Sequence, residues 1–399
     1  MRKIFNLIIL VVLTAQGVLG QVLPDKNWDG VNMLFSDEFN TPLSNFRPNY
    51  VDAPNRKWRA YFQELGCGLI TDNGGQVYQR SQCQFSPLEG TGLFRIVCDY
   101  AGHEIQQSEV EYPTTTCGIP DSIFYYSGAI ETRKRIQYGY IEMRCKLPIH
   151  KEAFPAFWLW GAQNNHVNDN YYEEIDIFEW TRKVEGVYTS DSIDAVGRRY
   201  YAGIWCNPHH GTYLPDSSDT TNHGAQYVGN SMIHVPDNGP LLNDWNVFGC
   251  EWSPGFVRWF LNGKLQNTYA MHDTIPQHPM TLKINYTIKK NALVFDPVTQ
   301  MPDWQDGDEM VIDYVRVYKL KRDCKSIAYI TTLSALQNFN FSLKKEIHIC
   351  PNTHLSITSG QGDTFRATQK IRLKNVTIPQ GSKVSFIMQD CSHAEAIVD

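Results

Sequence analysis

The chain has 399 residues, of which 13% are aromatic and 20% charged, and its formal net charge is −6. A chain of this length can bury one large hydrophobic core and still leave residues for a small second module. The mildly acidic balance includes no basic excess, so no nucleic-acid partner is expected.

The first twenty residues have the order of a secretory signal. Arg2 and Lys3 precede an apolar run over 4–15, and small residues follow at 18–20, which is the pattern of a cleaved export signal. The apolar run is shorter than the roughly 20 residues that span a bilayer, so no transmembrane segment is predicted. We therefore leave residues 1–20 out of the fold and expect an exported protein, whether secreted, periplasmic or at the cell surface.

The rest of the chain has the texture of an all-β protein. Helical periodicity is almost absent, while short runs rich in Val, Ile, Tyr, Phe and Trp recur between clusters of Gly, Pro, Asn and Asp. The clearest runs are 92–100, 139–148, 156–161, 247–265, 280–288 and 310–320. This pattern most simply predicts a β-sandwich.

The composition changes near residue 321. Residues 321–399 contain no tryptophan and consist of short strand-like runs broken by Pro and Gly turns. We interpret them as a small β-rich C-terminal module that follows a main domain over 21–320. Nothing in the sequence of this module names a ligand.

The ten cysteines leave two interpretations open. An exported protein meets an oxidising compartment, so some pairing is plausible, yet connectivity cannot be deduced from sequence and no spacing matches a zinc site. Buried free thiols are the alternative for Cys145 and Cys250, which lie inside strand-like runs. Sequons for N-glycosylation occur at Asn285, Asn340 and Asn375, and the sequence does not decide their use.

An acidic strand over 171–180, with the sequence YYEEIDIFEW, raises the question of function. Glu174 and Asp176 share one face of an extended strand, whereas Glu179 is three residues further on and should point to the other. A β-bulge between Asp176 and Glu179 would return Glu179 to the first face. Three unpaired carboxylates cannot face a core, so this face is expected to be the floor of a cleft.

Paired carboxylates indicate glycoside hydrolysis. In the retaining reaction one carboxylate attacks the anomeric carbon, and the other protonates the leaving oxygen and later activates water, with the two groups about 5–5.5 Å apart. The intervening Asp176 adds a like charge and a hydrogen bond, which can separate the pKa values of Glu174 and Glu179. The alternative interpretation is an acidic strand edge without function.

These residues resemble the signature of glycoside hydrolase family 16, E-[ILV]-D-[IVAF]-x-E. Five more blocks stand in the family's order, and together they cover roughly residues 27–320. The blocks are 35–39, 138–148, 155–160, 244–263 and 312–318. The resemblance implies a β-jelly-roll sandwich with a concave glycan-binding cleft, in which Glu174 is the nucleophile, Glu179 the acid/base and Asp176 their electrostatic helper.

Aromatic side chains near the acids are candidates for glycan stacking, because sugar rings present flat C–H faces. Trp158 and Trp160 alternate on the preceding strand-like run, and Tyr172 and Trp180 flank the acids. We expect these four residues to bind substrate. For Trp158 and Trp160, burial in the core is the alternative.

The resemblance implies a monomeric, endo-acting enzyme that cleaves a β-linked polysaccharide by double displacement. β-1,3-Glucan of the laminarin type is the first choice, on family frequency. The alternative is a hydrolase of a sulfated or neutral galactan, of the carrageenan, agar or porphyran type, and basic residues after the motif keep it open: Arg182, Lys183, Arg198 and Arg199. A non-catalytic glycan-recognition protein is disfavoured, because such versions typically lose the catalytic acids.

Two departures from the family pattern weaken the substrate assignment. Glu173 stands where a small residue often precedes the nucleophile, and Asn246 replaces a frequent histidine. Neither departure touches the three acids, so the mechanism is expected to be intact.

The family also implies a structural metal. Its members often hold calcium on the convex side, which by position assigns oxygen ligands to Asp313, Glu38 and the main chain near Gly92. The ion would support stability, and no cofactor is expected to be required for the chemistry.

Overall fold

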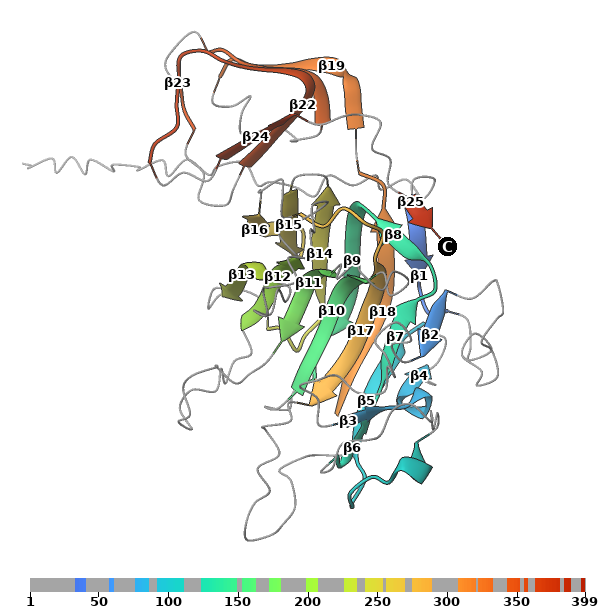
Figure 1. Cartoon of the computed structure of the whole chain (residues 1–399). Helices are drawn as coiled ribbons and strands as arrows, with labels where there is room; N and C mark the ends of the chain where they lie inside the picture. Colours follow the sequence, from blue (N-terminus) through green and yellow to red (C-terminus); the bar gives the residue numbers. More distant parts are fainter. Residues whose placement is uncertain are drawn as a thin grey trace, which may run out of the picture.

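The computed structural model of the chain consists almost entirely of strands in the part that it describes (Figure 1). The predicted signal over 1–20, the residues Arg182, Lys183 and Arg198, and Asn340 lie outside that part. No helix among the described residues is long and apolar enough to cross a membrane. The described residues are 33–40, 57–60, 76–85, 92–110, 123–148, 153–162, 172–180, 199–206, 226–234, 241–253, 256–269, 275–288, 308–320, 322–332, 343–351, 355–357, 363–380, 384–388 and 396–398.

A sheet of ten strands forms one layer of the main domain. Its neighbours in order are β16 (Lys264–Tyr269), β15 (Phe256–Leu261), β14 (Asn246–Ser253), β9 (Gly139–Lys146), β18 (Asp308–Tyr318), β5 (Phe94–Tyr100), β6 (Tyr125–Ser127) and β3 (Gln76–Tyr78). Two more strands pair at the side, β1 (Met33–Asp37) with β18 and β4 (Cys83–Phe85) with β5. Two short 3₁₀ turns, η3 (Arg80–Gln82) and η4 (Gln107–Glu109), lie on the connections.

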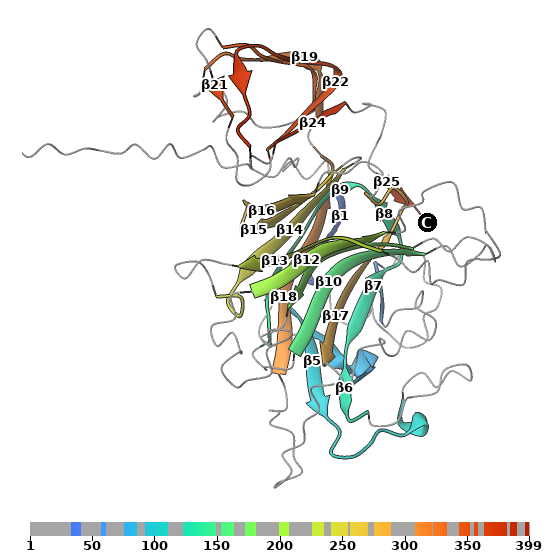
Figure 2. The same ribbon diagram turned by 60° about the vertical axis from the view of Figure 1, so that its left-hand side comes forward.

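A seven-stranded antiparallel sheet forms the second layer, which Figure 2 shows in front of the first. Its order is β13 (Gln226–His234), β12 (Arg199–Cys206), β11 (Tyr172–Trp180), β10 (Ala153–Ala162), β17 (Thr281–Ile288), β7 (Ala129–Thr132) and β2 (Trp58–Ala60). The predicted acidic strand is β11, near the middle of this sheet. The predicted all-β sandwich is confirmed.

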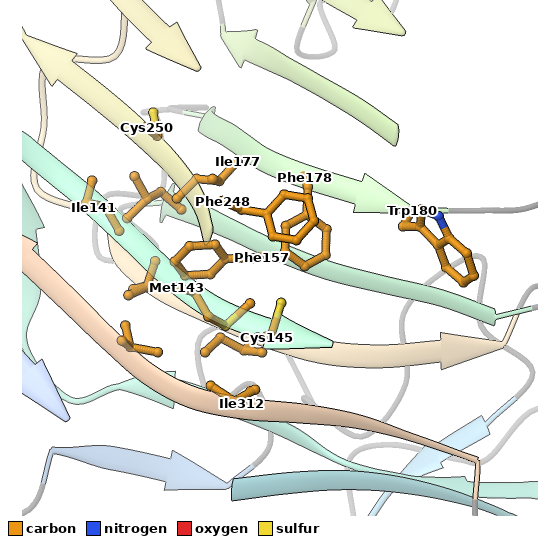
Figure 3. Close-up of a cluster of buried hydrophobic side chains, with 14 of the residues drawn as sticks. Ile141, Met143, Cys145, Phe157, Ile177, Phe178, Trp180, Phe248, Cys250 and Ile312 are labelled. Carbon is orange, nitrogen blue, oxygen red and sulfur yellow. The ribbon is translucent and has the colours of Figure 1, made fainter. Parts of the chain in front are cut away.

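The core lies between the two sheets, because alternate side chains of each sheet face the other (Figure 3). Met143 and Cys145 of β9 meet Phe157 of β10 and Phe178 of β11 in one buried cluster. Full burial of an aliphatic or aromatic side chain contributes about 1.5–3 kcal/mol. The alternation of apolar residues in the sequence therefore reports which face of each strand is inward.

Two cysteines in this core are free thiols. Cys145 and Cys250 are fully buried and unpaired, and burial raises the pKa of both thiols far above the usual range. The interpretation of these two residues as buried thiols is confirmed.

The C-terminal residues form a parallel ladder. The strands β19 (Arg322–Ile330), β20 (Leu343–Ile349), β22 (Asp363–Leu373) and β24 (Val384–Met388) pair in chain order, and β21 (Leu355–Ser356) pairs in parallel with β23 (Val376–Thr377). Successive parallel strands that pair in chain order are the arrangement of a β-solenoid. Short runs between turns predicted strands here, but their parallel pairing was not foreseen.

The solenoid and the sandwich meet in one apolar cluster. Tyr318, Leu320 and Phe260 from the sandwich side pack in a single buried cluster with Ile347 and Phe365 of the solenoid. The last strand, β25 (Ala396–Val398), pairs antiparallel with β8 (Arg135–Gln137) of the main domain, as Figure 1 shows. The chain thus contacts the sandwich again at its last strand.

Candidate active site

The predicted β-bulge lies in β11. Trp158 of β10 is opposite Asp176, and Phe157 is opposite Phe178, so Ile177 is the extra residue. The register between β11 and β12 also shifts between Asp176 and Glu179. The bulge prediction is confirmed.

The bulge sorts the side chains of β11 between the two faces of the sheet. Ile177 and Phe178, although consecutive, both lie in the core, and Glu179 is consequently half-exposed. Glu174 is also half-exposed, while Asp176 is only 2% exposed. Glu174, Asp176 and Glu179 therefore share the face opposite the core, which we call the outer face of the seven-stranded sheet.

Burial controls the charge of the central acid. Burial raises the pKa of Asp176 well above its usual range, and the neighbouring charges of Glu174 and Glu179 raise it further. Asp176 hydrogen-bonds to the side chains of Glu174 and Trp205. Burial and the neighbouring charges therefore favour the protonated form of Asp176, which can donate its proton to the carboxylate of Glu174.

Both tryptophans of β10 are on the outer face. Trp158 is opposite Asp176 and Trp160 is opposite Glu174, while Phe157 and Leu159, which alternate with them, face the core. Trp158 is half-buried and Trp160 is 6% exposed. The structure thus places both rings beside the acids rather than in the core, with only Trp158 substantially open.

A polar network holds Trp158 in place. Its indole N–H donates to Asn285 Oδ1 at 2.8 Å, and Asn285 Nδ2 donates to Tyr78 Oη at 3.0 Å and to Thr287 Oγ1 at 2.7 Å. Asn285 is 3% exposed. Its sequon is therefore inaccessible in the folded protein, and the amide supports the aromatic residue instead.

A buried charge cluster continues along the outer face. Lys283, opposite Trp158, is fully buried and pairs with Glu131, which also pairs with Arg59 of β2. The ammonium lies 5.9 Å from the Trp158 ring centroid and 5.3 Å from that of Trp160, within cation–π range.

The residues of this cluster were not among the predicted site residues, although the sequence of β17 contains a signal for them. In β17, apolar Leu282 and Ile284 alternate with polar Lys283 and Asn285. Such alternation marks a strand with one apolar and one polar face. It indicates that Lys283 and Asn285 lie on the polar face of their strand, while the pairing of β17 with β10 decides that this face carries the acids.

Trp180 is a correction to the predicted substrate-binding set. It is 1% exposed and belongs to the hydrophobic core (Figure 3). The bulge explains the error, because the residue that follows an outward Glu179 must point inward. Tyr172 is the first residue of β11, two positions before Glu174. Its side chain lies outside the part of the chain that the structure describes.

Glu173 has a structural role. It faces away from Glu174, is fully buried, and accepts the backbone N–H groups of Gln277 at 2.8 Å and His278 at 3.0 Å. Burial raises its pKa to about 8, although these two hydrogen bonds act in the opposite direction. Asn246, the other departure, donates to the carbonyls of Leu241 and Asp244 and so stabilises the turn before β14.

The residues assigned to calcium lie in ion pairs. Glu38 is beside Gly92, where an added Cβ would be 2.8 Å from the Glu38 carbonyl oxygen, but its carboxylate accepts two hydrogen bonds of 2.7 Å from Arg316. Asp313 is bound by Arg144. No group of three or more potential metal-ligating side chains occurs in the described part of the chain. Both carboxylates assigned to calcium are thus bound by arginines in this structure, and calcium binding stays a prediction.

Comparison with known proteins places this geometry in a family. The family model for the glycoside hydrolase family 16 domain of β-porphyranases A–D matches residues 100–320, more than half of the chain. The chain belongs to glycoside hydrolase family 16. The matched range contains all three acids of the bulged strand of this family 16 protein, together with Trp158, Trp160 and Lys283.

Curated relatives of the family 16 domain are distant. The chain is 25% identical over 209 residues to glucan endo-1,3-β-glucosidase A1 of Niallia circulans, covering 49% of this chain and 26% of that protein. It is 24% identical over 289 residues to the κ-carrageenase of Pseudoalteromonas carrageenovora, covering 69% of this chain and 62% of that protein. The chain thus spans less than two thirds of both relatives.

A solved structure supports the fold. Porphyranase B of Zobellia galactanivorans superposes with a TM-score of 0.50 at 16% identity, covering 72% of this chain and 91% of that one. At this identity the similarity establishes the sandwich fold alone, and the substrate of the family 16 domain is a separate question.

Proposed function

We propose that the chain is a retaining, endo-acting glycoside hydrolase whose substrate is a β-linked galactan of the porphyran type. The observation that carries the reaction is the bulge in β11, which aligns Glu174, Asp176 and Glu179 on one face. An acidic strand edge without function would have no need for the bulge.

The chemistry follows from the protonation states. Glu174 attacks the anomeric carbon, and Glu179 protonates the glycosidic oxygen as the bond breaks. Glu179 then takes a proton from water, which hydrolyses the glycosyl-enzyme ester with retained configuration. Asp176 lies between them, its raised pKa disfavours a third negative charge in the site, and its hydrogen bond holds the Glu174 carboxylate in place.

The substrate class is supported by the matched family model and by charge. A row of cross-strand partners runs over the outer face from Asp176 through Trp158, Lys283 and Glu131 to Arg59. Two cations share one carboxylate, and Arg59 retains an exposed fraction of 28%. The net positive charge of Lys283, Glu131 and Arg59, at the Arg59 end of the row, favours an anionic, sulfated polysaccharide.

β-1,3-Glucan, the first choice from the sequence, is the second candidate. The similarity to the Niallia glucanase supports it. Reducing-sugar release from porphyran, agarose, κ-carrageenan and laminarin separates the two substrates. Laminarin turnover without porphyran turnover would contradict the galactan proposal and leave the reaction unchanged.

The roles of the acids are tested by substitution. Glu174→Gln and Glu179→Gln should each remove most hydrolysis and leave the melting temperature nearly unchanged, because each role needs an ionisable carboxyl group. Glu309→Gln, which alters a partly exposed carboxylate bound to Arg95 on the other sheet, is the control.

Azide separates the two roles. It should rescue Glu174→Ala with inverted product and Glu179→Ala with retained product. Full activity of either Gln variant would contradict the assignment.

A further inference from the structure

The backbone of the catalytic bulge is bonded to the opposite sheet. Trp259 of β15 is 1% exposed in the core, and its indole N–H donates to the main-chain carbonyl of Asp176 at 2.8 Å. Carbonyls in a regular strand accept hydrogen bonds from the neighbouring strand. At this bulge, a side chain of the ten-stranded sheet binds a carbonyl of the seven-stranded one.

This carbonyl lies at the start of the bulge. A bulge disrupts the ladder at its extra residue, here Ile177, and Asp176 is the residue before it. A buried carbonyl needs a partner, and Trp259 supplies one in a fixed direction. The orientation of the peptide between Asp176 and Ile177 affects how the strand continues to Glu179.

Satisfying a buried indole is not by itself a sufficient explanation for this bond. The indole N–H of Trp180 is also buried, and it has no hydrogen-bond partner in the described structure. The core therefore tolerates a buried tryptophan whose indole N–H makes no hydrogen bond. The bond of Trp259 is directed to the peptide at the start of the bulge, within the segment that connects Glu174 to Glu179.

We infer that Trp259 is a positioning residue for the catalytic pair: its indole N–H holds the Asp176 carbonyl and so sets the geometry of the bulge between the two glutamates. The inference rests on the proposed function, since it assigns to Trp259 an effect on that same reaction. It acts through the backbone of Asp176 and does not touch substrate.

The chain offers a matched control. Trp252 of β14 lies in the same sheet, is fully buried, and donates its indole N–H to the main-chain carbonyl of Pro276 at 2.8 Å. Trp252→Phe and Trp259→Phe therefore remove the same ring volume and the same kind of bond. Only the second alters the bulge.

The experiment measures kcat, KM and melting temperature for both variants on the best polysaccharide of the panel. Trp259→Phe should lower kcat at least tenfold with KM unchanged within twofold. Trp252→Phe should lower the melting temperature comparably and keep kcat within twofold. Equal kcat values for the two variants, or a loss at Trp259 that appears only in KM, would overturn the inference.

A second variant keeps the test decisive if Trp259→Phe does not fold. Benzothienylalanine at position 259 replaces the indole N–H by sulfur and preserves the shape of the ring. It should reproduce the tenfold loss of kcat, and wild-type kcat in this variant would overturn the inference. Inactive wild-type protein on every polysaccharide would instead contradict the proposed function, so the two failures are distinguishable.

Discussion

Glu173 should make the stability of the fold depend on pH in a direction opposite to that of most carboxylates. Its pKa rises from 4.5 to about 8 on folding, because the side chain is fully buried. The Nδ1 of His278 lies 3.5 Å from Glu173 Oε1, and burial lowers the pKa of that ring, which favours its neutral form. The folded protein thus keeps a proton that the unfolded chain releases above pH 4.5.

The sign and size follow from proton linkage. Between these two pKa values the unfolded state binds fewer protons, so the free energy of unfolding falls by about 1.4 kcal/mol per pH unit. Over the whole interval from 4.5 to about 8 the loss is on the order of 5 kcal/mol. Below pH 4.5 the contribution is constant, and above pH 8 the loss is complete.

Glu173→Gln isolates this contribution. The amide retains one acceptor for the N–H groups of Gln277 and His278 but does not ionise. Urea unfolding at pH 5, 6, 7 and 8 should show the variant gaining stability relative to the wild type as the pH rises. Glu309→Gln, on a partly exposed carboxylate bound to Arg95, is the control for the substitution itself. Parallel free-energy curves for wild type and Glu173→Gln would refute the reasoning.

Three other outcomes are expected from the same structure. Deletion of Ile177 should leave Glu179 on the outer face, because Asp176, Phe178 and Glu179 then alternate regularly, but it should lower the melting temperature by removing a buried side chain from the core; reducing-sugar release and calorimetry measure both, and a folded deletion variant without any hydrolysis would show that the shared face alone is not sufficient. A chain ending at residue 320 should still hydrolyse short soluble oligosaccharides, because the acids lie upstream of that residue. It should melt at a lower temperature, because it lacks the solenoid residues of the apolar cluster shared with the sandwich and lacks β25. A folded truncation without hydrolysis would show instead that the solenoid completes the site. If calcium binds as the family resemblance implies, chelation should lower the melting temperature without changing kcat; an unchanged melting temperature and no calcium by elemental analysis would remove that prediction.

Local patterns determined a large part of this protein. Apolar runs between Gly, Pro and Asn clusters specify strands, and the spacing of Glu174, Asp176 and Glu179 favours a bulge, because a bulge keeps all three carboxylates on the face away from the core. These inferences depend on side-chain alternation within one strand. They did not need knowledge of which strands are neighbours.

Tertiary structure decided what depends on neighbours. Which strands pair, and so which residues meet Trp158, depends on contacts between distant segments, and Lys283 joined the site only because β17 lies beside β10. The inward position of Trp180 follows from the bulge, but it was recognised only from the packing of Trp180 in the core. The bond from Trp259 to Asp176 joins residues far apart in the chain. Because packing between two sheets selects such contacts, no periodicity within one strand encodes them.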